Sequence, residues 1–158
     1  NFLALATKYI KNQDLKLLFI GDGEQYEEVK SILEENFKNR YILLGSKKHH
    51  EIIDYYSAAD LSILPSLMEA TSISGLEAMA ASLPLVGTNI GGIPVIIKDG
   101  ENGFLCESEN PEDLALKIDK LLNSDIIEMG KKSKEMVNIH FDWIEIAKET
   151  LEEYQAIL

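Results

Sequence analysis

Short apolar runs alternate with longer amphipathic stretches through most of the chain. Five runs have the length and composition of buried strands, and they cover residues 16–20, 41–44, 61–64, 85–87 and 103–106. Three stretches between them carry apolar residues at three- and four-residue steps, as amphipathic helices do, and they cover residues 24–36, 50–58 and 73–81. This alternation predicts an α/β fold, a Rossmann-like doubly wound parallel sheet with helices on both faces.

The N-terminal end departs from this alternation. Residues 1–10 read as a helix that leads into the first strand, whereas a doubly wound half ordinarily begins with a strand. No internal repeat or flexible linker divides the sequence. We therefore expect residues 1–158 to form a single domain, a fragment whose first strand lies before Asn1.

The C-terminal third carries helices without a further strand. Three helical patterns cover residues 112–122, 126–139 and 144–158, and Asn110 before Pro111 suits the N-cap of the first. The last pattern carries a set of large apolar side chains: Trp143, Ile146, Leu151, Tyr154 and Ile157. We expect them to pack into the core, with an interface to a partner domain as the alternative.

Composition and charge narrow the classes of function. With 158 residues, 46% of them apolar and 27% charged, the chain resembles an ordinary globular domain. Its formal net charge of −12 would repel nucleic acid and anionic lipid, so we expect neither nucleic acid nor membrane contact from this domain. Cys106, the single cysteine, excludes an internal disulfide and fits a reducing, cytoplasmic location.

Two glutamates flank the start of the helix predicted after the third strand. Glu69 falls in the loop that follows the strand, and Glu77 lies eight positions later, about one turn inside the helix. Carboxylates accept hydrogen bonds from sugar hydroxyls, and the free N–H groups of a helix N-terminus hold phosphate oxygens. The spacing therefore favours a site for a sugar that carries a diphosphate.

The segments around this acid pair form an ordered series. It runs from the strand L-S-I-L-P-S through E-A-T-S-I-S-G-L-E-A-M-A and P-L-V-G-T to G-G-I-P and D-G-E-N-G-F-L. The series resembles the donor-binding half of GT-B glycosyltransferases, most closely the retaining family 4 enzymes with their E-x7-E signature. The likeness extends from about residue 17 to residue 122.

The resemblance implies a function and roles for the two acids. The chain would be the donor-binding, C-terminal domain of a glycosyltransferase that moves a hexose-type sugar from a nucleotide-diphosphate sugar to a glycan, lipid or other acceptor, as in polysaccharide biosynthesis. Glu77 would bind the ribose hydroxyls. Glu69 would contact the transferred sugar near the reacting face, which makes it the catalytic candidate.

The same resemblance assigns further donor contacts to two loops. Backbone N–H groups of Ile73 and Ser74 would hold the diphosphate, and the polar residues Thr71 and Ser72 share their segment, where the family often has Gly-Phe-Gly. Ser72 is equally suited to be the N-cap of the helix. Gly91 and Gly92 resemble the family's Gly-Gly loop, although a tight turn explains them as well, and Val95 stands where the family often has Glu.

Two glycine loops nearer the N-terminus are weaker candidates for donor contact. Gly21 and Gly23 match a turn of the family after the first visible strand, although a plain turn before a helix explains them too. Gly45 and Ser46 would lie beside the nucleotide base. They precede a basic run, residues 47–50, whose side chains we interpret as a solvated surface because its two histidines have no third ligand nearby for zinc.

The resemblance also has implications for cofactors and for a second domain. The family needs no metal or other cofactor, and no D-x-D pair is present to bind one. An acceptor-binding domain would precede Asn1, together with a strand and loop that supply an Arg and a Lys to the diphosphate. We therefore expect the isolated chain to bind donor weakly and to catalyse nothing alone.

Two other functions remain open from the sequence. The same fold carries nucleotide-sugar 2-epimerases, which form an epimer from a UDP-sugar without an acceptor. A non-catalytic interaction domain is the third possibility, favoured if no nucleotide binds and if the last helix presents an exposed apolar face. A phosphoacceptor receiver domain is set aside, because its acidic pair before the first helix and its late Lys are absent.

Overall fold

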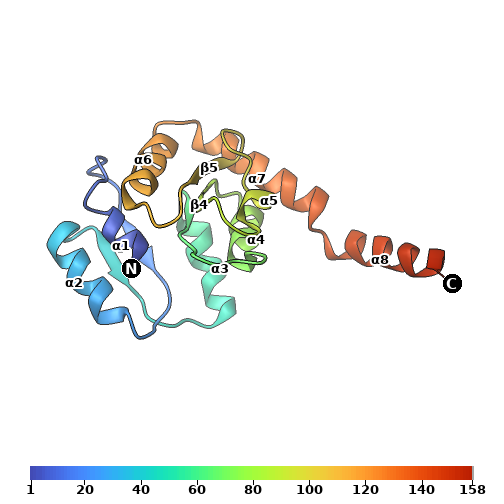
Figure 1. The fold of residues 1–158 in the computed structure, drawn as a ribbon, viewed down its shortest axis with the longest axis horizontal. Helices are drawn as coiled ribbons and strands as arrows, with labels where there is room; N and C mark the ends of the chain where they lie inside the picture. Colours follow the sequence, from blue (N-terminus) through green and yellow to red (C-terminus); the bar gives the residue numbers. More distant parts are fainter. Residues whose placement is uncertain (158) are drawn as a thin grey trace.

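The computed structural model describes residues 1–157 of the chain. Its strands are β1 (Leu17–Phe19), β2 (Tyr41–Leu43), β3 (Ser62–Leu64), β4 (Leu85–Thr88) and β5 (Gly103–Cys106). Its helices are α1 (Phe2–Ala6), α2 (Tyr26–Asn36), α3 (His49–Ala58), α4 (Ile73–Ala80), α5 (Ile93–Ile96), α6 (Pro111–Leu122), α7 (Ile126–His140) and α8 (Trp143–Ile157). Figure 1 shows this order along the ribbon. The α/β fold with parallel strands agrees with the sequence-based prediction.

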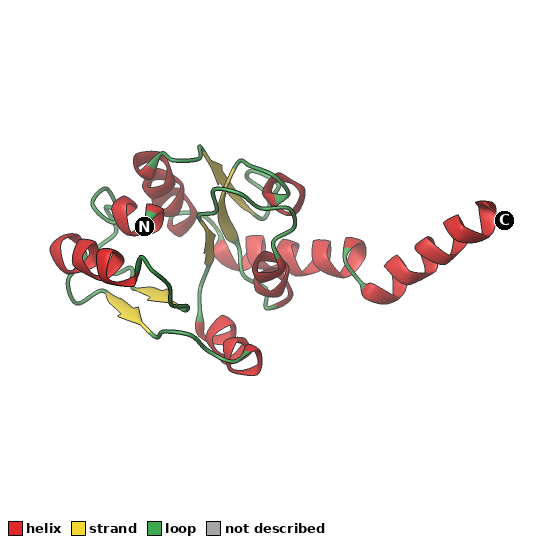
Figure 2. Cartoon of the chain, turned by 60° about the horizontal axis from the view of Figure 1, so that its bottom comes forward, coloured by secondary structure: helices red, strands yellow, loops and turns green. Residues whose placement is uncertain are grey.

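The strands form two sheets. β1 pairs with β2 in parallel, and β3, β4 and β5 form a second parallel sheet in that order. Figure 2 shows the two groups of strands apart from one another. Because all the pairs are parallel, the loops that follow the strands of one sheet gather at the same edge of it. The predicted single sheet is therefore present as two parts.

Side chains of the three-stranded sheet alternate between two helical layers. Val86, Phe104 and Cys106 point into a cluster with α1, α2 and α6. Leu64 and Leu85 point into a second cluster, formed with α4, α5 and α7. This period of two is what a strand with helices on both faces requires.

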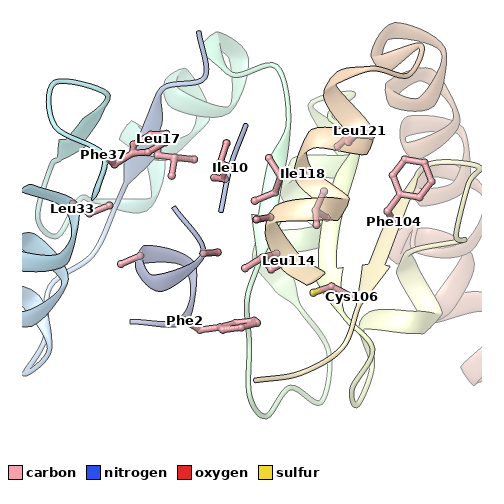
Figure 3. Packing of buried hydrophobic residues seen from close by; sticks show 14 of the residues in the cluster. Phe2, Ile10, Leu17, Leu33, Phe37, Phe104, Cys106, Leu114, Ile118 and Leu121 are labelled. Atoms are coloured by element: carbon pink, nitrogen blue, oxygen red, sulfur yellow. The ribbon is translucent and has the colours of Figure 1, made fainter. Parts of the chain in front are cut away.

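The first cluster joins the two sheets through their covering helices. Phe2 of α1 and Leu17 of β1 lie on one side of it, and Leu114 and Ile118 of α6 face them from the other (Figure 3). Ile118 is fully buried. Helix α6 thus packs between the three-stranded sheet and the N-terminal part of the chain.

Helix boundaries follow local chemistry. Asn110 caps α6 as predicted, because its side chain accepts a hydrogen bond of 3.0 Å from the N–H of Asp113 and Pro111 occupies the first helical position. The helix expected at residues 1–10 ends earlier, at Ala6, and turns replace its last part. A short helix, α5, follows Gly92 where the sequence suggested only a loop.

The expectation for the last helix was wrong. No residue of α8 is buried, and Trp143 and Ile157 are 79% and 80% exposed. Figures 1 and 2 show the helix projecting away from the rest of the molecule. The physical reason is that α7 ends at His140 and the chain leaves the body there, so α8 finds no surface of this domain to pack against. Leu158, the last residue of the predicted helix, lies outside the described residues.

Candidate functional site

The predicted phosphate site is the N-terminus of α4. The side chain of Ser72 accepts a hydrogen bond of 3.3 Å from the N–H of Gly75, so Ser72 is the N-cap, as its alternative interpretation held. Its side chain is buried, and its hydroxyl lies 3.3 Å from that of Ser74. Within residues 1–157, the N–H groups of Ile73 and Ser74 have no protein acceptor, and both residues are exposed. Two donors at the positive end of the helix are thus open to a ligand.

Glu69 lies in the loop between β3 and α4, and that loop is fixed at several points. The Ser66 hydroxyl donates to the Glu69 carboxylate at 3.2 Å, and the hydroxyl of Thr88 at the end of β4 donates to the Ser66 carbonyl at 2.7 Å. The N–H of Gly92 donates to the Glu69 carbonyl at 3.0 Å. The carboxylate is therefore oriented in the free protein, next to the exposed Ala70 and Thr71.

Gly91 and Gly92 are glycines because two loops meet there. A Cβ on Gly91 would lie 1.8 Å from the carbonyl oxygen of Glu69, and one on Gly92 would lie 2.0 Å from that of Ala70. Gly91 also has a positive φ of 49°. The two glycines bring the loop after β4 against the loop that carries Glu69. The close approach seen here is to protein backbone, and contact of the pair with a donor stays a prediction.

Glu77 projects from the second turn of α4 toward α3. Its carboxylate lies 3.5 Å from Nδ1 of His49, the first residue of α3. The side chain of Glu77 is 28% exposed and that of His49 is 77% exposed. A partly exposed carboxylate has about four lone-pair sites and retains acceptor capacity for hydroxyl groups. The position is compatible with the predicted ribose contact.

Tyr56 connects the same two helices. Its hydroxyl donates to the carbonyl of Ser74 in the first turn of α4, at 3.1 Å. Burial of the ring and the nearby negative charge of Glu77 raise the pKa of Tyr56 from 10.0 to about 12. Tyr56 is therefore a neutral donor at physiological pH and holds the first turn of α4 in place.

The loops after β1 and β2 lie side by side. The N–H of Gly21 donates to the carbonyl of Gly45 at 2.8 Å, and Gly21, Gly23 and Gly45 all have positive φ values. A Cβ at any of the three would meet no atom within 4 Å, so these glycines serve the backbone conformation. Ser46 follows and is exposed. In the described part of the chain, no hydrogen bond joins these loops to α4.

Sequence reasoning missed the roles of His49 and Tyr56. His49 belonged to a basic run interpreted as solvated surface, and most of its side chain is indeed exposed. Tyr56 was not among the residues that the sequence singled out. No sequence motif marks either contact, because both depend on how α3 and α4 are placed.

Residues 1–157 contain neither a metal-binding cluster nor a membrane-spanning helix. No three His, Cys, Asp or Glu side chains lie close enough to hold a metal ion. None of the described helices has the length and apolar character that crossing a membrane needs.

Comparison with known proteins identifies the family. Residues 1–140 match the family described as glycosyl transferases group 1. The chain belongs to this family.

Named relatives include characterised and uncharacterised enzymes. The chain is 33% identical over 136 residues to an uncharacterised glycosyltransferase of Methanocaldococcus jannaschii, and 31% identical over 137 residues to the N-acetyl-alpha-D-glucosaminyl L-malate synthase of Bacillus anthracis. Each match covers 85% of this chain but only 38% and 35% of the relative. The chain thus spans little more than a third of the length of these proteins.

Solved structures share the fold. The sucrose-phosphate synthase of Thermosynechococcus elongatus superposes with a TM-score of 0.84 at 26% identity, over 99% of this chain and 41% of that one. TarM of S. aureus, in a complex that contains UDP, superposes with a TM-score of 0.81 at 26% identity, over 96% of this chain and 31% of that one. The fold is that of GT-B glycosyltransferases.

Proposed function

We propose that this chain is the donor-binding domain of a retaining glycosyltransferase that uses a nucleotide-diphosphate hexose. The observation that carries the proposal is the free N-terminus of α4, where the N–H groups of Ile73 and Ser74 lack protein acceptors between two acids, Glu69 and Glu77. Membership of the glycosyl transferases group 1 family supports it. UDP in the TarM complex supports a nucleotide as the ligand.

The parts of the site have separate tasks in this proposal. The amides at the tip of α4 hold the diphosphate and stabilise the negative charge that grows on it as the glycosidic bond to the sugar breaks. Glu77 accepts hydrogen bonds from the ribose hydroxyls. Glu69, oriented by Ser66, contacts the sugar as its anomeric carbon becomes oxocarbenium-like. The E-x7-E spacing of the two acids is the basis for assigning retention and family 4.

The remaining assignments extend the same proposal. We propose that Thr71, Ser72 and Ser74 contact the diphosphate and that the loop of Gly91 and Gly92 contacts the donor. A further set of loop residues would contact the nucleotide: Gly21, Gly23, Gly45 and Ser46. Ser72 contributes through the cap it forms, because its buried hydroxyl already accepts from Gly75. We propose that no metal is needed and that the protein works in the cytoplasm, where a free thiol such as that of Cys106 persists.

Transfer itself is proposed to need an acceptor-binding domain. The isolated chain should bind donor weakly and show no measurable transfer, and activity should return in a protein that carries an N-terminal domain. Turnover by residues 1–158 alone would contradict this part of the proposal.

A nucleotide titration followed by NMR tests the proposal. UDP, GDP and ADP, each alone and with an attached hexose, are added to the labelled chain. We expect the amides of Ile73 and Ser74 to shift with a nucleoside diphosphate, and Glu69 and its neighbours to respond only when a hexose is attached. A folded chain in which no residue from 69 to 77 responds to any of these ligands would contradict it.

The same samples also test two alternative functions, an isomerase and a non-catalytic interaction domain. Formation of a 2-epimer from a UDP-sugar without acceptor would indicate an isomerase. The exposed apolar residues of α8 meet one of the two conditions for an interaction domain, and the other is the absence of any nucleotide response. The titration therefore separates the interaction domain from the transferase.

A further inference from the structure

One face of α3 is turned toward the acid of α4. His49 and Tyr56 lie seven positions apart, which places them on the same face of the helix. Nδ1 of His49 lies 3.5 Å from the Glu77 carboxylate, and burial of the ring together with the negative charge of Glu77 raises the pKa of Tyr56 to about 12. Glu77 is the only titratable side chain of α4. The carboxylate proposed to bind ribose is therefore flanked by two side chains of α3.

The start of α3 is fixed, although the helix buries little of its surface. No residue of α3 is buried, and within the described chain Tyr56 is its only member packed against a hydrophobic cluster. The N–H of Lys48 donates to the Glu51 carboxylate at 2.9 Å, and the N–H of Glu51 donates to the Lys48 carbonyl at 2.9 Å. These two bonds define the first turn, to which His49 belongs. Its polar contact with Glu77 is thus one of few links between α3 and α4.

The charge of the imidazole decides how strongly His49 acts on Glu77. A protonated imidazole attracts the carboxylate as an ion pair, whereas a neutral one lacks this attraction. A carboxylate has about four lone-pair sites, so contacts with His49 and Tyr56 leave capacity for hydroxyl groups. Protonation of His49 therefore orients Glu77 and leaves room on it for a ligand.

Of the groups gathered here, imidazole is the type that changes charge near neutral pH. Lysines stay protonated and carboxylates ionised between pH 6 and pH 8, whereas an imidazole ordinarily takes up a proton in this range. A pKa of about 12 keeps the Tyr56 hydroxyl neutral throughout it. The charged or titratable groups around His49 are Glu77, which faces it from α4, and on its own segment Lys47, Lys48, His50, Glu51 and Tyr56.

We propose that His49 is a positioning residue for donor binding. In its protonated form it holds the Glu77 carboxylate in place for the ribose hydroxyls and adds a positive charge next to a site for an anionic ligand. The affinity for the donor should then rise as the pH falls from 8 to 6. The inference rests on the proposed function, because it assumes that a nucleotide-diphosphate sugar binds at the N-terminus of α4. Since the side chain of His49 is 77% exposed, the expected effect is modest.

Three proteins are compared: the wild-type chain, His49→Gln and the control His50→Gln. Glutamine keeps an N–H donor but has no charge at any pH. His50 is the matched control because it carries the same imidazole one position later and, in the part of the chain that the structure describes, belongs to no ion pair. Both histidines are exposed, so both variants should fold.

NMR of the free chain tests the contact without any ligand. The ¹³C resonance of the Glu77 side-chain carboxyl is followed from pH 8 to pH 6 in the three proteins. We expect this resonance to shift in wild type and in His50→Gln, because the nearby imidazole gains a charge, and to stay constant in His49→Gln. A wild-type resonance that does not shift, or one that shifts equally in His49→Gln, would overturn the inference.

UDP-glucose is the probe for the second measurement. Its diphosphate is linked to the sugar and has no monoester proton that titrates between pH 6 and pH 8, so a pH dependence of binding comes from the protein. Titrations at low salt, followed at the methyl group of Ile73, give the Kd at both pH values. We expect wild type and His50→Gln to bind about twofold to fivefold more tightly at pH 6 than at pH 8, and His49→Gln to bind equally at both.

The possible outcomes separate this inference from the proposed function. Equal pH dependence in wild type and His49→Gln would overturn the inference and leave the proposed function in place. Tighter binding at pH 8 in wild type would also overturn it, because the imidazolium would then compete with ribose for Glu77. If the Glu77 resonance follows the charge of His49 but no protein binds UDP-glucose at either pH, the role in donor binding is overturned through failure of the proposed function.

Discussion

The two sheets of this domain differ in how deeply their strands are buried. All four residues of β4 are buried, because β3 and β5 pair with its edges and helices cover both faces. In the smaller sheet, Leu18 of β1 and Ile42 of β2 are 42% and 54% exposed. The sequences of the two parts are similarly apolar, so the difference teaches that burial follows from the number of neighbours and not from the strand alone.

The same contrast applies to the loops at the carboxyl ends of the strands. In the three-stranded part, the loops after β3 and β4 are joined by the bond from Gly92 to Glu69 and packed without a Cβ between them. In the two-stranded part, Gly21 and Gly45 share one hydrogen bond and lie in open space. A binding site needs side chains held in fixed positions. The three-stranded sheet provides this support for the acid pair and for the N-terminus of α4.

Truncating a core leucine in each sheet should give the largest difference. Leu85→Ala removes a fully buried side chain of β4 and should lower the free energy of unfolding by about 3 kcal/mol. Leu18→Ala, in β1, should lower it by less than about 1 kcal/mol because its side chain is partly solvated already. Urea unfolding of the two variants measures both values. Equal losses would break the contrast between the sheets.

Removing the hydroxyl that links α3 to α4 should have a smaller effect. Tyr56→Phe loses the hydrogen bond to the Ser74 carbonyl and should cost about 1 kcal/mol at pH 8. The pKa of Tyr56 is raised to about 12 in the folded protein, above its value of 10.0 in the unfolded chain. Between pH 10 and pH 12 the unfolded state therefore loses this proton first, and the stability that Tyr56 contributes is lost.

The difference between wild type and Tyr56→Phe should accordingly shrink as the pH rises through this window. Because Tyr41 also has a raised pKa, of about 12, the comparison with Tyr56→Phe isolates the titration of Tyr56. Tyr41→Phe is the matched control, and it should leave the pH dependence that belongs to Tyr56 in place. A constant difference from pH 8 to pH 12 would contradict the assignment.

Removal of α8 should have the smallest effect on stability. A chain that ends after Asp142 loses no buried side chain of the described domain, so its free energy of unfolding should stay within about 0.5 kcal/mol of the parent. Thermal or urea unfolding measures this. A loss above about 1 kcal/mol would mean that the helix packs on the body in solution.

Sequence patterns predicted those elements of the fold that depend only on residues close together in the sequence. The strand at residues 103–106 and the cap at Asn110 agree with the structure, since both depend on neighbouring residues only. The expectation that α8 packs into the core was wrong, because an amphipathic pattern indicates which face of a helix is apolar but not what covers that face. The division of the strands into two sheets could not be predicted either, because an apolar run does not indicate which other strand it pairs with.

For the candidate site, spacing located the helix tip and the two acids but not their surroundings. The N-cap role of Ser72 was one of two interpretations, and a bond to Gly75 decides it. The contacts of Glu77 with His49 and of Tyr56 with Ser74 join residues that are far apart in the sequence. The reason for Gly91 and Gly92 is likewise a tertiary contact, with the backbone of residues 69 and 70.

The central claim is that the tip of α4 binds a nucleoside diphosphate between two acids with different tasks. Calorimetric or NMR titration with UDP and a UDP-hexose measures it in three variants: Glu77→Gln, Glu69→Gln and the control Glu101→Gln, an exposed acid on another loop. We expect Glu77→Gln to weaken both ligands by about tenfold or more, because each hydrogen bond to a charged acceptor is worth about 1.5 kcal/mol or more. Glu69→Gln should weaken only the UDP-hexose, and Glu101→Gln neither. Unchanged UDP binding in Glu77→Gln, in a chain that still folds, would contradict the account.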